Sequence, residues 1–157
     1  MKGREKMNTI EVLKDAQEML GMNQKEFGVF AGVSTRTVNS WFTGYRTCAD
    51  HVAEMIHRLA DLDSRMLASG EETSILRRWC LVRSYGQDEF MTAYGSKADA
   101  LRDAQMEWDH MTKKEKANSE TFEVILTDVC LTDRTIDGCF GWAAGAEVLE
   151  VAKSWIK

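Results

Sequence analysis

The stretch 22–44 places the strongest constraint on the fold, because it holds the start and stop signals of two short helices. Asn23 is a favourable N-cap, and Glu26 lies three residues later, where its side chain can complete a capping box. Gly32 can end the first helix, since glycine adopts the left-handed conformation at little cost. Ser34 is a second N-cap, and the helix that it opens ends at Gly44. The stretch therefore predicts two helices joined by a tight turn.

The apolar residues of this stretch are expected to lie on the inner faces of the two helices. Phe27 and Phe30 belong to the first helix, while Val38 and Trp41 belong to the second. Gly28 leaves room for the two backbones to approach each other closely. The polar residues of the second helix should then face outward: Thr35, Arg36, Thr37, Asn39 and Ser40. Short or forked polar side chains of this kind suit base edges and phosphates in a DNA major groove.

The stretch resembles the helix-turn-helix of the lambda Cro/repressor-type (XRE-like) DNA-binding domains, and the resemblance covers about residues 8–67. The matching positions, all in register, are Gln24, Phe27, Gly28, Ala31, Gly32, Val33, Ser34, Val38, Trp41 and Gly44. Asn23 stands where the family usually has Thr, and Phe42 where it often has Glu, so Phe42 is expected to make a packing or dimer contact. The alternative is an ordinary αα-hairpin in a helical bundle, which would not require five exposed polar residues beside a buried tryptophan.

The resemblance implies a DNA-binding role for nine residues. Gln24 would contact a phosphate, and Ser34 would cap the recognition helix. Base edges would be met by Thr35, Arg36, Thr37 and Ser40, with Arg36 suited to bidentate contact with guanine, while Asn39 would reach a phosphate or an adenine. Tyr45 and Arg46 follow the helix in a loop that would run beside the DNA backbone. The alternative for this loop is an ordinary solvated surface.

Charge is distributed unevenly along the chain, whose formal net charge is −5. Up to Ser64 there are eight basic and nine acidic residues, and the remainder carries twelve basic and sixteen acidic residues. A nearly neutral reading head implies modest non-specific affinity for DNA, so specific contacts or dimerisation must supply the difference. No apolar run approaches the length of a membrane span, and the first ten residues lack the apolar segment of a signal peptide. We therefore expect a cytoplasmic protein without a membrane partner.

The residues that support catalysis or metal binding do not occur in recognisable motifs. Cys48, Cys80, Cys130 and Cys139 form no CxxC pair, and the three histidines are not at metal-ligand spacing with them, which predicts free thiols and no metal site. The chain has no Gly-rich phosphate loop, no HExxH and no Gly-x-Ser-x-Gly. Carboxylates near His110 are interpreted as a solvated helix end. We expect no cofactor, no catalytic residue and no enzyme activity.

The remaining elements predict an α+β fold of two domains. A helix capped by Asn8 and ended by Gly21 and a long helix over 47–67 complete an all-α helix-turn-helix domain at 1–68. The segment 69–73 is interpreted as a short, pliable linker. Alternation of side chains then predicts a hairpin over 79–94 and a strand over 122–127, with helices at 96–111 and 112–118 between them. The segment 128–140 allows a short fourth strand, and 143–156 predicts an amphipathic terminal helix.

This second domain, 74–157, is therefore expected to be a small ββαβ unit with a terminal helix. Its segment 94–124 faintly resembles uncharacterised small proteins of phages and mobile elements, a likeness that carries no activity. The chain as a whole predicts a transcriptional regulator, a repressor of phage or mobile-element origin that binds an inverted repeat in a double-stranded DNA operator as a homodimer. The alternative is an anti-CRISPR-type protein inhibitor with an autoregulatory helix-turn-helix head, in which the acidic second half contacts a host nuclease or another protein.

Overall fold

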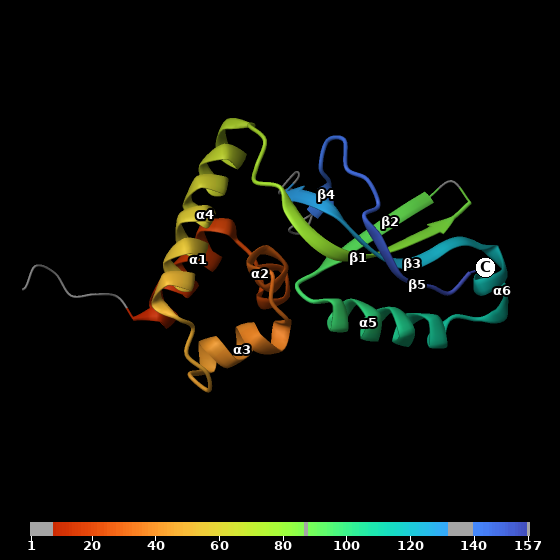
Figure 1. Cartoon of the computed structure of the whole chain (residues 1–157), viewed down its shortest axis with the longest axis horizontal. Coiled ribbons are helices and arrows are strands. Elements are labelled where there is room, and N and C mark those ends of the chain that lie inside the picture. Colours follow the sequence, from red (N-terminus) through yellow and green to blue (C-terminus); the bar gives the residue numbers. More distant parts are fainter. Residues whose placement is uncertain (1–7, 87, 132–139, 157) are drawn as a thin grey trace, which may run out of the picture.

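The computed structural model describes residues 8–86, 88–131 and 140–156 (Figure 1). The fold is α+β, as predicted, with a helical head followed by an antiparallel sheet part. The helical head consists of α1 (Thr9–Leu20), α2 (Gln24–Ala31), α3 (Thr35–Thr43) and α4 (Asp50–Ser69). The sheet part consists of β1 (Leu76–Tyr85), β2 (Asp88–Tyr94), α5 (Lys97–His110), α6 (Lys113–Asn118), β3 (Ser119–Leu131), β4 (Phe140–Trp142) and β5 (Glu150–Ser154).

Local capping signals set the ends of the helices. Asn8 accepts a hydrogen bond from the Glu11 N–H at 2.9 Å, and Asn23 and Glu26 form the expected reciprocal capping box at the start of α2. Ser96 and Thr112 cap α5 and α6, again as predicted. The long helix is displaced from the predicted range 47–67, because α4 begins three residues later and continues to Ser69.

The sheet is antiparallel with the strand order β2-β1-β3-β4, and β5 also pairs with β3. The predicted hairpin is present, with Trp79 opposite Tyr94 and Tyr85 opposite Asp88. On its other edge β1 pairs with β3, so Trp79 also lies opposite Leu126. A short fourth strand, β4, pairs with the end of β3, but it shares only Phe140 with the segment 128–140 in which the sequence allowed such a strand. The rest of that segment at 132–139, which includes Cys139, lies outside the described residues.

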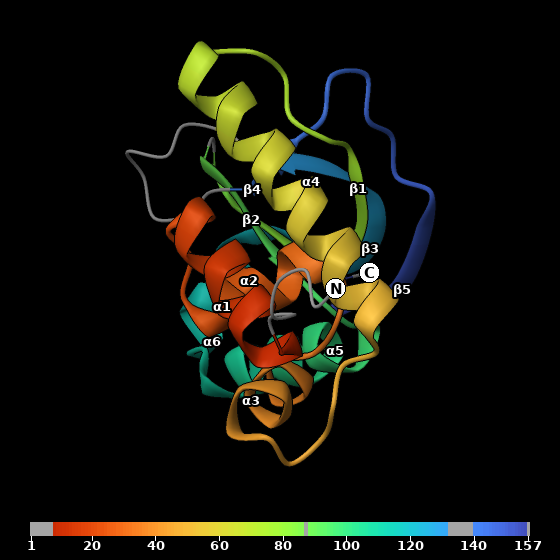
Figure 2. The ribbon, with the colours of Figure 1, turned by 90° about the vertical axis from the view of Figure 1, so that its left-hand side faces the viewer.

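Both faces of the sheet are covered. Successive side chains of a strand point to opposite sides, so one strand can contribute to a core on each face. Cys80 and Val82 of β1 and Ile125 of β3 pack into the same core as the helical head. Leu81 and Phe122 face the other way and pack in a second core with α5. Figure 2 shows the helical head on one side of the sheet. The helical head and the sheet part, predicted as separate domains, therefore share one hydrophobic core.

Hydrogen bonds hold the segment that joins the helical head to the sheet part. Thr73, within the predicted linker, is buried, and its hydroxyl donates to the Leu131 carbonyl at 3.2 Å and accepts from the Leu131 N–H at 3.0 Å. Asp63 of α4 is fully buried and accepts from the N–H and the hydroxyl of Ser74 at 3.0 and 2.8 Å. The segment is thus held at its end, in contrast to the pliable linker that its composition suggested.

The terminal amphipathic helix predicted for 143–156 is wrong, because the chain forms β5 there and pairs with β3. The Leu149 N–H donates to the Leu126 carbonyl, and the Trp155 N–H donates to the Phe122 carbonyl, so β3 supplies the backbone partners. The apolar residues expected on one helix face are divided: Val148 and Val151 are each 49% exposed, whereas Ala152 and Trp155 pack against the second core. β-branched residues favour a strand once such an unpaired edge is within reach.

Candidate nucleic-acid interface

The turn between α2 and α3 has the predicted close crossing. A Cβ atom on Gly28 would lie 2.9 Å from the Val33 carbonyl oxygen and 3.4 Å from a methyl carbon of Val38. Gly32 ends α2 with a φ of 78°, and its N–H donates to the Gly28 carbonyl at 2.8 Å. A side chain at position 28 would push α2 and α3 apart, so glycine is required there.

The inner face of α3 fixes the helix against the head. Val38 is fully buried and Trp41 nearly so, as predicted. Phe42 stacks on Phe27 of α2, with 5.9 Å between the ring centroids. Phe42 is therefore a packing residue within the chain, which was one of the two roles expected for it. These contacts leave the opposite face of α3 to the polar side chains.

Three of the five polar residues expected to face outward on α3 are exposed: Thr35, Arg36 and Asn39. Thr37 is half-buried. Its N–H and its hydroxyl both lie within hydrogen-bond distance of the Ser34 hydroxyl, at 3.1 and 2.9 Å. Ser34 is therefore the N-cap that the sequence predicted. The exposed residues lie at the start and in the middle of the helix, where side chains are best placed to enter a groove.

The prediction that Ser40 faces outward is wrong. Ser40 is only 9% exposed, and its hydroxyl donates to the Thr37 carbonyl at 2.7 Å. The loop after α3 folds back over this position, since the Arg46 N–H donates to the Ser40 carbonyl at 3.1 Å. Ser40 thus supports the loop through its carbonyl, and its hydroxyl hydrogen is used within α3, so the hydroxyl could meet a base only as an acceptor.

The loop and α3 together form a hollow of about 320 Å³ that is lined by five of the nine predicted residues: Arg36, Thr37, Ser40, Tyr45 and Arg46. Two arginines that are ten positions apart in the sequence, Arg36 and Arg46, thus line the same hollow. The Tyr45 ring is 83% exposed beside them. Guanidinium donors and an exposed ring are suited to phosphate oxygens, base edges and stacking.

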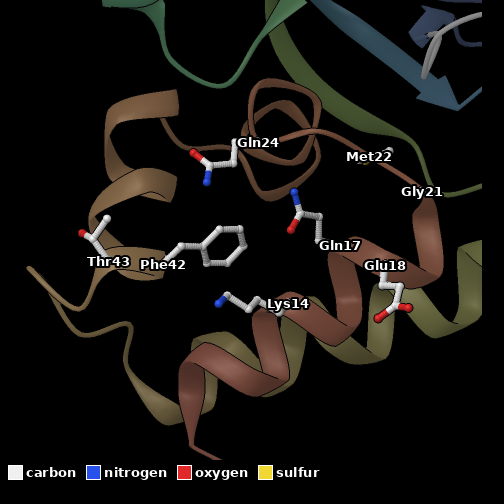
Figure 3. Close-up of a pocket in the computed structure, with 8 residues that line it drawn as sticks. All are labelled: Lys14, Gln17, Glu18, Gly21, Met22, Gln24, Phe42 and Thr43. Atoms are coloured by element: carbon white, nitrogen blue, oxygen red, sulfur yellow. The ribbon is translucent and has the colours of Figure 1, made fainter.

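Gln24 lies in a different hollow, of about 660 Å³, between α1, α2 and the end of α3. Figure 3 shows the amide groups of Gln17 and Gln24 and the ammonium group of Lys14 around the Phe42 ring. Lys14 was not anticipated, because it lies on the first helix and only the packing of α1 brings it near the start of α2. A cation beside a helix N-terminus is a favourable environment for a phosphate.

Comparison of the chain with protein-family models, curated proteins and solved structures gives no match.

The sheet part also reaches α3, which the sequence did not suggest. The carboxylate of Asp99, on α5, accepts a hydrogen bond from the Thr35 N–H at 3.3 Å. The same carboxylate pairs with Arg102 at 2.9 Å, and Asp99 is itself buried. The Thr35 side chain remains exposed, so the contact occupies the helix end without covering the polar face. No local sequence pattern could reveal this pair, because 64 residues separate its members.

The thiols match the expectation where they are described. Cys48, Cys80 and Cys130 are free, and burial raises the pKa of Cys80 to about 12. The described part of the chain contains no cluster of three or more His, Cys, Asp or Glu side chains placed to hold a metal. Among its helices, none has both the length and the apolar character of a membrane span.

Proposed function

We propose that this protein is a sequence-specific regulator that binds double-stranded DNA through α3. The observation that supports this most directly is the position of Arg36 and Asn39, exposed on a short helix whose other face is locked by Val38 and Trp41. A rigid helix with a polar outer face is what major-groove reading requires. The resemblance of the turn to XRE-like domains agrees with this role.

The proposed contacts divide into base reading and backbone positioning. Arg36 would read guanine, Asn39 would reach an adenine or a phosphate, and Thr35 would meet an adjacent base edge. Arg46 and Tyr45 would hold the DNA backbone at one end of α3. Gln24, with Lys14 close by, would hold a phosphate at the other end. Ser40 would act indirectly, by fixing the loop that carries Arg46.

A single reading head would bind weakly, because residues 1–64 hold eight basic and nine acidic residues and the whole chain carries a net charge of −5. We therefore propose a homodimer on an inverted repeat, with half-sites about 34 Å apart, one turn of the duplex. We further propose that the protein acts as a repressor in the cytoplasm and that it originates from a phage or mobile element.

The second candidate is a protein inhibitor with an autoregulatory head, in which the sheet part contacts a host nuclease or another protein. One observation favours it. Apolar side chains are exposed where β4 and β5 lie: Trp142, Val148, Leu149 and Val151. Exposed apolar groups of this kind suit a protein partner better than DNA. The two candidates share the head and differ in the partner of the sheet part.

Selection of bound fragments from random double-stranded DNA by the full chain tests the primary proposal. We expect one enriched inverted repeat, and we expect Arg36→Ala to lose the preference at one position of each half-site while other positions remain selected. Sedimentation with and without the selected fragment would give the stoichiometry. Binding without any enriched sequence, or with a preference that Arg36→Ala leaves intact, would contradict the proposal.

A further inference from the structure

The sheet part holds the end of α2 through a single arginine. Arg78 of β1 donates from Nε to the Val29 carbonyl at 2.5 Å and from an Nη to the Phe30 carbonyl at 2.8 Å. Both carbonyls belong to the last turn of α2, where few backbone N–H groups remain as partners. The Val29 carbonyl also accepts from the Gly32 N–H at 3.3 Å. A cation at this end is also favoured by the helix dipole.

The sheet part holds the start of α3 through a carboxylate of the opposite sign. Asp99 accepts from the N–H of Thr35, the first residue of α3, and the Asp99 N–H in turn donates to the Ser96 hydroxyl at 3.2 Å. An anion at a helix N-terminus is favoured by the helix dipole. The cation Arg78 lies at the C-terminal end of α2, and the anion Asp99 lies at the N-terminal end of α3. Ser96 is the N-cap of α5, and Asp99 lies in the first turn of that helix. The cap therefore fixes the part of the helix that carries the carboxylate.

The backbone of the sheet part also touches the backbone of the α2–α3 turn. Gly95 lies between β2 and α5, and a Cβ atom placed there would collide with the Val33 carbonyl and lie 2.5 Å from the Gly28 carbonyl oxygen. The turn of the helix-turn-helix therefore rests directly on the turn that leads into α5. Arg78, Gly95 and Asp99 together surround the turn, and we refer to them as the clamp.

We infer that the clamp positions the recognition helix, and that Asp99 is a positioning residue for base reading although it belongs to the sheet part. This inference rests on the proposed function. Arg36 is the residue next to Thr35, so a displacement of the helix start would move the guanidinium that reads guanine. Bidentate base contacts tolerate displacements of only about 0.5 Å, so holding Thr35 in place has a direct effect on selectivity.

Two variants separate a positioning role from simple charge repulsion between Asp99 and DNA. Asp99→Asn keeps one oxygen that can accept from the Thr35 N–H but removes the charge and the ion pair with Arg102, whereas Asp99→Ala removes all three. We expect Asp99→Ala to lower the discrimination between the selected operator and a variant changed at the Arg36-read base by about 3-fold to 10-fold, the size of one hydrogen bond. We expect Asp99→Asn to restore most of it. Asp109→Ala, a carboxylate further along α5, is the matched control and should change nothing.

Hydrogen exchange of the Thr35 amide, measured by NMR on the DNA-free full chain, tests the contact independently of DNA. Asp99→Ala should accelerate it by about 3-fold to 10-fold, while Asp99→Asn and Asp109→Ala leave it close to the wild-type rate. Thermal unfolding of each variant confirms that the fold is retained. If Asp99→Ala fails to fold, the Asp99→Asn variant alone must retain both the exchange rate and the discrimination.

Three results would overturn the inference. Unchanged Thr35 exchange in Asp99→Ala would remove the contact on which it depends. Higher affinity for all DNA in both Asp99 variants, without loss of discrimination, would assign the carboxylate to repulsion. Faster exchange in a protein that selects no DNA sequence would contradict the proposed function and the base-reading role together, and would leave a contact that only stabilises the fold.

Discussion

Gly95 lies against the carbonyl group of Val33, although 62 residues separate them in the sequence and they belong to different parts of the molecule. The backbone of the β2–α5 connection thus touches the backbone of the helix-turn-helix turn. Such close approach requires a residue without a side chain. The position of α3 is consequently defined by the sheet part as well as by the core of the helical head.

Substituting Gly95 by alanine should therefore destabilise the whole chain. The added methyl group would collide with backbone atoms, which cannot move aside as a flexible side chain can, so the cost should be about 3 kcal/mol. Urea unfolding followed by circular dichroism measures it. Gly70→Ala is the control: its φ is +76° but nothing lies within 4 Å of the new methyl, so only about 1 kcal/mol of backbone strain is expected. Equal losses would show that Gly95 is not in close contact.

Arg78→Lys should lower the free energy of unfolding by about 1.5–3 kcal/mol, because an ammonium group cannot reproduce the two parallel hydrogen bonds of the guanidinium to Val29 and Phe30. The neighbouring Arg77 pairs with Asp128 on the surface and is largely exposed. Arg77→Lys should therefore cost less than about 1 kcal/mol. The same urea titration compares them, and similar losses for both would argue against a cap at the end of α2.

The helix-turn-helix could be predicted because its signals are local. Asn23 with Glu26, and Ser34 with Thr37, satisfy each other within three residues, and Gly28 and Gly32 act on their immediate neighbourhood. Such patterns are readable from the sequence alone.

The errors arose where distant segments decide the outcome. Ser40 follows the polar periodicity of α3, but the returning loop at Arg46 covers it. Val148 and Val151 are spaced for a helix face, but the edge of β3 offers hydrogen bonds that favour a strand. The shared core and the Asp99 contact depend on how the sheet docks, and no local pattern records that.

Alkaline pH should weaken the fold through Cys80. Burial raises its pKa from 9.0 to about 12, so the folded state keeps the thiol protonated after the unfolded chain has lost the proton. The contribution of the protonated Cys80 thiol to the free energy of unfolding is fully present below pH 9 and declines as the pH rises towards 12. At pH 10 the decline should be about 1 kcal/mol relative to pH 8. Urea titrations of wild type and Cys80→Val at both pH values measure it. A decline of the same size in the variant would assign the effect to other groups.

A fragment ending at residue 70 should not retain the native head. Cys80, Val82 and Ile125 belong to the same core as the buried residues of α1–α4. Their removal would expose the apolar side chains that they cover. The fragment would also lose Arg78 and Asp99 at the helix ends. We expect poorly dispersed NMR spectra and a broad thermal transition compared with the full chain. A fragment with a sharp transition and native-like amide shifts would show that the head folds independently.

Arg36→Ala and Arg46→Ala should weaken DNA binding in different ways. Arg36 is exposed on α3, so its loss should cost about 1–3 kcal/mol at one base position and relax selection there. Arg46 lies in the loop, and its backbone N–H, which the substitution preserves, holds that loop to Ser40. Its loss should weaken binding to all sequences alike and reduce the slope of log affinity against log salt by about one. Fluorescence anisotropy with the selected operator and a single-base variant, at several salt concentrations, distinguishes the two effects. Equal and sequence-independent losses from both substitutions would contradict the separate roles assigned to base reading and backbone contact.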